Sequence, residues 1–111
     1  MPHYLFQWKY KDEAVKAMIT APQDRPTEFR KAVEAFGGRV HQFYFALGDY
    51  DGMGIVEFPS IDRCVACSLT LTGGGADAVL RTTALLTADE GRAAMEQASS
   101  VHSGYRSPSE A

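Results

Sequence analysis

The chain alternates between stretches with a two-residue hydrophobic period and stretches with helical spacing. Residues 3–10 (HYLFQWKY) place an aromatic side chain at every second position, a pattern typical of a strand with one buried face. The segments 39–47, 53–58 and 77–86 are rich in aromatic, β-branched or aliphatic residues. They predict three further strands.

Helical spacing fills the intervals between these strands. Residues 11–20 carry apolar side chains at helical spacing, and a second such set covers residues 29–36. Pro22 and Pro26 interrupt the pattern, so we expect two short helices or one kinked helix before the second strand. A further helix fits residues 60–72, where it separates the third strand from the fourth.

The C-terminal part begins with a capping box, in which Thr87 is the N-cap and Glu90 reaches back to it. We expect a helix from this box to about residue 98, followed by a flexible polar tail over residues 99–111. The element order predicts one α+β domain over residues 1–98 with a ferredoxin-like β-α-β-β-α-β plan. It implies a four-stranded antiparallel sheet with a C-terminal helix.

The turn between the second and third predicted strands consists of residue types that tolerate positive φ or bond their own backbone, Gly48-Asp49-Tyr50-Asp51-Gly52. Pairing the two strands evenly about this turn sets Phe43 near Glu57. In that register one sheet face holds His41, Phe43, Phe45, Leu47, Met53, Ile55 and Glu57, and the other holds Tyr44, Ala46, Gly54, Val56 and Phe58.

Both faces of this sheet are therefore predicted to be largely apolar, although helices can cover only one of them. An antiparallel sheet with an open face normally presents polar residues to water. An uncovered apolar face usually marks an interface. We expect the open face to pair with a second copy of the chain.

These features together resemble the GYD-domain family, whose members are small proteins of the dimeric α/β-barrel type. The resemblance rests on the aromatic first strand and on the run GGRVHQFYFALGDYD, residues 37–51. It covers about residues 3–95 and implies a subunit that forms a barrel-like homodimer. In the motif turn of Gly48, Tyr50 and Asp51, we expect Asp51 to accept backbone amides and hold the reversal.

Composition excludes several classes of partner. The net charge is −3, whereas a nucleic-acid binder normally shows a basic face. Residues 51–58 mimic an RNA-binding strand, but Asp51, Met53 and Ile55 stand where that chemistry needs one basic and two aromatic residues. No apolar run approaches the roughly 20 residues of a membrane helix, and no signal-peptide pattern is seen at the N-terminus. The expected location is cytoplasmic.

The cysteines and histidines show no pattern of a metal or redox site. Cys64 and Cys67 form a lone C-x-x-C inside a predicted helix, whereas a redox pair belongs at a helix N-terminus and a structural zinc site needs two more ligands. Cys64 lies beside Ile61 and Val65 on an apolar stripe, which predicts core packing. The three histidines have no metal-binding spacing, so neither a metal nor a cofactor is predicted.

Polar side chains within otherwise apolar strands mark the candidate site. Such groups around an apolar cavity are typical of a small-ligand site. His41 and Glu57 are candidates for an acid–base pair, or alternatively for a solvated rim residue and a bond across the dimer. Arg81 has a surface salt bridge as its alternative role. The predicted ligand-binding set is Gln7, Trp8, His41, Phe43, Phe45, Glu57 and Arg81, with the three aromatic residues as walls.

Three functions remain open on the sequence. The favoured one is a homodimeric GYD-domain protein that binds a small apolar molecule, either between sheet and helices or at the dimer seam. The second is a cofactor-independent monooxygenase- or isomerase-like enzyme, by analogy of fold. The third is a pure assembly module. The sequence does not decide whether the chain is an enzyme.

Overall fold

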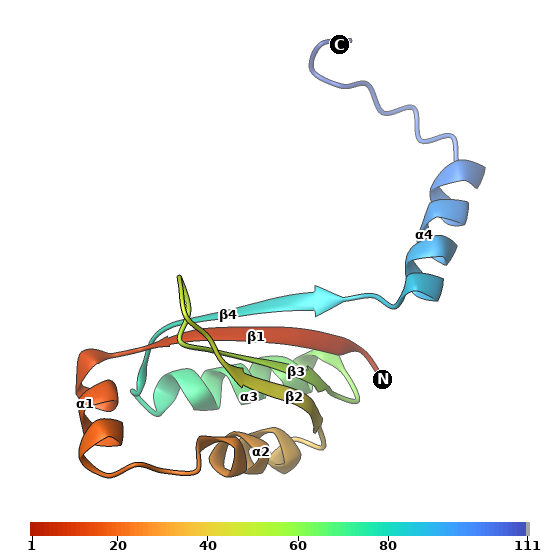
Figure 1. Ribbon diagram of the computed structural model, residues 1–111. Coiled ribbons are helices and arrows are strands. Elements are labelled where there is room, and N and C mark those ends of the chain that lie inside the picture. The colour runs from red at the N-terminus through yellow and green to blue at the C-terminus, as the bar shows by residue number, and fades with distance from the viewer. Residues whose placement is uncertain (111) are drawn as a thin grey trace.

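A computed structural model describes residues 1–110 and has the order β1-α1-α2-β2-β3-α3-β4-α4 (Figure 1). Two helices, α1 and α2, replace a single helix before β2, as the two prolines indicate. The α+β order is confirmed. The bounds are β1 (His3–Tyr10), α1 (Asp12–Thr20), α2 (Arg25–Ala35), β2 (Arg39–Phe45), β3 (Gly52–Glu57), α3 (Ile61–Gly73), β4 (Asp77–Leu85) and α4 (Ala88–Ser100).

The strands form one antiparallel sheet in the order β2-β3-β1-β4. The helices α1, α2 and α3 lie on one side of this sheet and leave the other side open (Figure 1). The arrangement is the ferredoxin-like plan expected from the element order. The alternation of β1 directs its aromatic side chains toward the helices, where they are buried: Tyr4, Phe6, Trp8 and Tyr10.

The core is built mainly from aromatic rings that pack close to the backbone of β3. The Trp8 ring lies 5.1 Å from the Phe29 ring and 5.4 Å from the Phe43 ring, measured between centroids. Two glycines make room for these rings. A Cβ added at Gly52 would lie 2.5 Å from the Trp8 indole, and one at Gly54 would lie 2.8 Å from the Phe29 ring.

The register between β2 and β3 differs from the predicted one: Phe43 pairs with Gly54 rather than lying near Glu57, a shift of three positions, and β2 also contains a β-bulge. Val40 pairs with Val56, but Gln42 rather than His41 pairs with Ile55. One extra residue is thus inserted into β2, and every later residue of the strand changes face.

Because the shift from the predicted register is an odd number of residues, the predicted faces of Phe43, Tyr44 and Phe45 are wrong, whereas His41 lies on the predicted face with Glu57. Phe43 pairs with Gly54 and packs with the Trp8 and Phe29 rings on the helix side, not beside Glu57. Phe45 follows it on the helix side and packs edge-on against Phe43 at 5.5 Å. Tyr44 pairs with Met53, lies on the open face and is 55% exposed.

Helix α3 packs through its two cysteines and the half-buried Leu71, while its other large apolar side chains are more exposed. Cys64 and Cys67 are 2% and 0% exposed, which confirms their core packing. Burial raises the pKa of these thiols to about 11 and about 12, so both stay protonated and unreactive. The larger apolar side chains of α3 line a hollow of about 370 Å³ that is bounded on the sheet side by Tyr4 and Leu80. The stripe expected beside Cys64 is therefore largely exposed: Ile61, Val65 and Leu69.

Helix α4 and the segment after it project away from the sheet (Figure 1). The predicted capping box is confirmed, because the Glu90 N–H donates to Thr87 Oγ1 at 3.1 Å and the Thr87 N–H donates to Glu90 Oε1 at 2.9 Å. None of the α4 residues is buried. The radius of gyration is 18.0 Å, compared with about 13 Å for a compact domain of this length.

The close approach at Gly54 predicts a loss of stability in Gly54→Ala. The added methyl must displace the Phe29 ring, and overpacking of this kind costs about 1–3 kcal/mol. Urea denaturation should show a lower midpoint. The matched control is Gly91→Ala in exposed α4, where no atom lies within 4 Å of the added Cβ. This control should be neutral or stabilising, and equal losses in both variants would contradict the packing role of Gly54.

Candidate functional site

The motif turn ties the β2–β3 hairpin to β1. The Asp51 N–H donates to the Trp8 carbonyl at 2.8 Å, and the Asp51 carboxylate accepts the Tyr10 N–H at 2.9 Å. These bonds continue the β1–β3 ladder beyond its last pair, Trp8 and Gly52. Gly48 has φ +140°, a conformation that favours glycine. Asp51 therefore joins the motif turn to β1, and the N–H group that its carboxylate accepts belongs to Tyr10 of that strand.

The sheet divides the predicted ligand-binding set between its two faces. Trp8 and Phe43 line a hollow on the helix side, and Phe45 lines a neighbouring one. Gln7 and Arg81 are register partners, and their alternation with the buried residues of β1 puts them on the open face. His41 and Glu57 lie on that face too. The aromatic walls and the polar groups therefore do not line one pocket.

The helix-side hollow lies between β1, β2, α2 and the segment that joins α3 to β4. It has a volume of about 210 Å³. A second hollow of about 380 Å³ shares Tyr10 and Arg25 with the first and continues to α1 and Phe45. The first hollow combines aromatic walls with opposite charges, and it is lined by residues including Trp8, Tyr10, Phe29, Phe43, Arg25 and Asp77.

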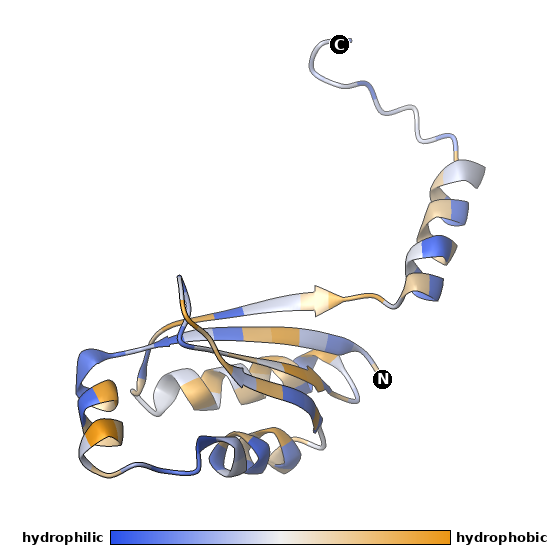
Figure 2. Ribbon diagram, viewed as in Figure 1, coloured by the Kyte–Doolittle hydropathy of each residue, from blue (hydrophilic) through white to orange (hydrophobic). Residues whose placement is uncertain are grey.

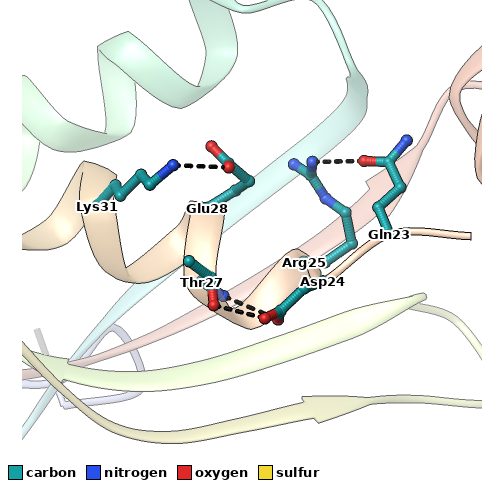
Figure 3. Close-up of polar contacts among 6 residues, drawn as sticks. All are labelled: Gln23, Asp24, Arg25, Thr27, Glu28 and Lys31. Atoms are coloured by element: carbon teal, nitrogen blue, oxygen red, sulfur yellow. Dashed lines mark hydrogen bonds and ion pairs between the residues drawn. The ribbon is translucent and has the colours of Figure 1, made fainter.

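Arg25 presents an unsatisfied donor at this hollow. Asp24 caps α2 by accepting the Thr27 N–H at 3.2 Å, which fixes Arg25 as the first residue of the helix. Arg25 Nη1 donates to Gln23 Oε1 at 2.9 Å (Figure 3). Arg25 Nε is buried and has no acceptor among the described residues. A buried N–H without a partner is costly, so this donor favours an acceptor that the chain itself does not supply.

Asp77 faces the same hollow from the first position of β4. Burial raises the pKa of the Asp77 carboxyl to about 6, although the Arg25 charge opposes the shift. A carboxyl with a raised pKa beside an apolar hollow is typical of a functional site. Sequence reasoning missed this pair. The Asp24 cap could have located Arg25 at a helix start, but no sequence signal connects Arg25 with Asp77.

On the open face, the Glu57 carboxylate lies beside two imidazole rings, those of His3 and His41. Its Oε2 is 3.6 Å from His3 Nε2, and its Oε1 is 3.4 Å from His41 Nε2. The two rings stack at 5.1 Å between centroids, and the Glu57 side chain is only 14% exposed. His3 was not among the predicted site residues, because a histidine at the start of a strand carries no signal of what lies opposite.

A family model for the GYD domain matches residues 4–95. The chain belongs to the GYD-domain family. Searching the curated proteins finds no match. No helix within residues 1–110 is both long and apolar enough to cross a membrane.

Solved structures similar to this GYD-domain chain are distant in sequence. MtbAldR is 14% identical with a TM-score of 0.57, and the match covers 78% of this chain and 53% of MtbAldR. The chain thus spans about half the length of that relative, and the likeness shows a shared fold. A hypothetical protein from Pyrococcus horikoshii is 13% identical (TM-score 0.49, covering 78% of this chain and 92% of that one). A protein from Agrobacterium tumefaciens is 17% identical (TM-score 0.49, covering 79% and 94%).

The position of Asp77 in the GYD domain predicts a pH-dependent stability. Its pKa is about 6 when folded and about 3.9 in an unfolded chain, so the folded state binds more protons between these values. This carboxyl therefore destabilises the fold above about pH 6, and the effect disappears as the pH falls toward about 4. Asp77→Asn should be more stable than the native protein at about pH 8, with the difference lost at about pH 4.

Urea titrations of Asp77→Asn and the native protein at both pH values measure this difference. Asp49→Asn, in the exposed part of the motif turn, is the matched control. The control should show no such change with pH. A constant difference between Asp77→Asn and the native protein at both pH values would contradict the assigned burial of the charge.

Proposed function

We propose that this GYD-domain protein is a homodimer that binds a small aromatic or apolar molecule carrying an acceptor group, in the helix-side hollow. The observation that carries the proposal is the buried Arg25 Nε, which donates to no described residue beside an aromatic-lined hollow. An anionic or carbonyl acceptor on the ligand would satisfy this donor, and the rings of Trp8, Phe29 and Phe43 would enclose its apolar part.

The volumes of the two hollows support a small ligand. Ligand pockets usually measure about 300–1,000 Å³. The hollows of about 210 and 380 Å³ share Tyr10 and Arg25, so a molecule spanning both would remain within this range. Asp77 would accept a hydrogen bond when ionised and donate one when protonated, and its raised pKa makes both forms accessible near neutral pH.

The homodimer is part of the proposal because two surfaces of the single chain have no partner. The open sheet face carries half-buried apolar side chains at Leu5, Met53 and Ile55, with polar groups between them. Helix α4 has apolar and polar residues and projects from the body (Figure 2). A second copy on the open face would cover these apolar side chains. It would also offer α4 a surface of the partner chain to pack against.

The hollow predicts binding of aromatic acids that Trp8 can report. Trp8 is the only tryptophan of the chain and lines the hollow, so its fluorescence should change saturably on titration with phenylacetate. Arg25→Gln should weaken binding by at least about tenfold, since a hydrogen bond to a charged group is worth about 1.5–3 kcal/mol. Phenylethanol, which lacks the carboxylate, should bind the native protein more weakly than phenylacetate does. Its affinity should also fall less in Arg25→Gln than that of phenylacetate.

The matched control is Arg30→Gln, which removes an exposed arginine from the same helix. It should leave phenylacetate binding unchanged. No saturable change with either compound, or equal losses in the two arginine variants, would contradict a ligand site at Arg25. A dimer without any such binding would favour the assembly role instead.

The open face predicts a dimer that a single charge can disrupt. Sedimentation velocity at micromolar concentration should report a dimer for the native protein. Ile55→Lys places a charge within the open face and should shift the protein to monomers with an unchanged far-UV circular dichroism spectrum. Ile61→Lys is the matched control, since Ile61 is 66% exposed and lies on α3, on the helix side of the sheet away from the proposed interface. A native monomer, or equal dissociation in both variants, would contradict this interface.

A further inference from the structure

The strands β1, β2 and β3 each direct one metal-ligating side chain to the same corner of the open face. The imidazole nitrogens of His3 and His41 and a carboxylate oxygen of Glu57 all lie within 4.8 Å of one another. We propose that these three side chains bind a divalent transition-metal ion, and that Zn²⁺ fits this donor set.

The donor chemistry and distances both fit zinc. Two imidazoles and one carboxylate form a known zinc donor set that leaves a fourth position open for water or a small ligand. Zinc bonds of about 2.0–2.1 Å in tetrahedral geometry place two donor atoms about 3.4 Å apart. Here Glu57 Oε1 lies 3.4 Å from His41 Nε2 and Glu57 Oε2 lies 3.6 Å from His3 Nε2, and with one ligand atom per residue the three donors lie within 4.8 Å of one another. Small side-chain movements would therefore complete the coordination.

The backbone holds the three ligands in place. His3 and Glu57 are direct partners in the β1–β3 ladder. His41 is the extra residue of the β2 bulge, so the bulge brings its side chain beside Glu57 while its neighbour Gln42 takes the position opposite Ile55. Bulges commonly re-aim a side chain next to a functional site. Ligands on three neighbouring strands form a more rigid site than ligands on loops.

Two charged groups adjoin the cluster. Arg39 Nη1 lies 3.9 Å from Glu57 Oε1, but the Arg39 side chain is 73% exposed and free to turn toward water. Its charge opposes a bound cation. Hydrogen bonds to Thr87 lower the pKa of Glu90 most, and the charges of His3 and the N-terminal ammonium lower it further. The negative charge of Glu90 favours a cation.

Calorimetric titration of the metal-stripped, untagged full chain with Zn²⁺ tests the site. We expect one Zn²⁺ per chain. His3→Ala, His41→Ala and Glu57→Gln should each weaken binding by at least about tenfold, since even outer-shell changes at zinc sites cost about 10–100-fold. His102→Ala is the matched control, because it removes the exposed histidine outside the cluster and should leave the affinity unchanged. Arg39→Ala should retain or tighten binding.

A measurement on the native protein avoids any dependence on how the variants fold. Zinc should shift the imidazole ¹⁵N signals of two of the three histidines, His3 and His41, and leave those of His102 unchanged. Absence of stoichiometric binding, or an equal loss of affinity in His102→Ala, would overturn the site. Arg25 lies on the other side of the sheet, so Arg25→Gln should not affect zinc binding. The test of the metal site is therefore independent of the test of the ligand hollow.

Discussion

The arrangement of this chain depends on aromatic rings that pack directly against the backbone of β3. Gly52 and Gly54 present no side chains on the helix side, and the rings of Trp8 and Phe29 occupy that space. A larger side chain at either glycine would remove the space and a substantial part of the core with it. Each ring buried here contributes about 1.5–3 kcal/mol.

The same cluster explains the bulge in β2. With even pairing about the turn, Phe43 would face away from the helices. The observed pairing instead places Phe43 over Gly54 and in contact with the Phe29 ring, and the extra residue at His41 joins this register to the pairs of Arg39 and Val40. Burying this ring offsets the loss of regular pairing at His41, because a bulge leaves only one residue unpaired. One local irregularity thus sends aromatic side chains to the helix side and an imidazole to the open side.

Local signals in the sequence predict most of the fold. The alternation of residues 3–10, the two prolines and the Thr87 capping box each act within a few residues, and the structure has a strand, two helices and a capped helix there. The features that the sequence did not predict depend on contacts between residues far apart in the chain. No glycine or proline marks the bulge at His41, and its side-chain partner Glu57 is determined by the pairing of three strands.

Two further features depend on the same non-local packing. Helix α3 buries Cys64, whereas Ile61 on the same helix is 66% exposed and lines a hollow shared with Tyr4 and Leu80. Arg25 and Asp77 are separated by two strands and a helix in the sequence, and only the tertiary fold brings them to one hollow. Sequence patterns therefore identify the candidate elements better than they identify the candidate site.

The open face connects the proposed dimer with the proposed metal site. Glu57 is 14% exposed in the single chain, and its two imidazole partners are 34% and 33% exposed. A second copy over this face would remove much of the remaining water from the three side chains. A carboxylate in such a place needs a permanent opposite charge, because the cost of desolvation otherwise exceeds the gain from burial. Arg39 supplies one positive charge from 3.9 Å, but its side chain is 73% exposed, and a bound dication would add two positive charges within the cluster itself. Dimer formation and metal binding should therefore stabilise one another through Glu57.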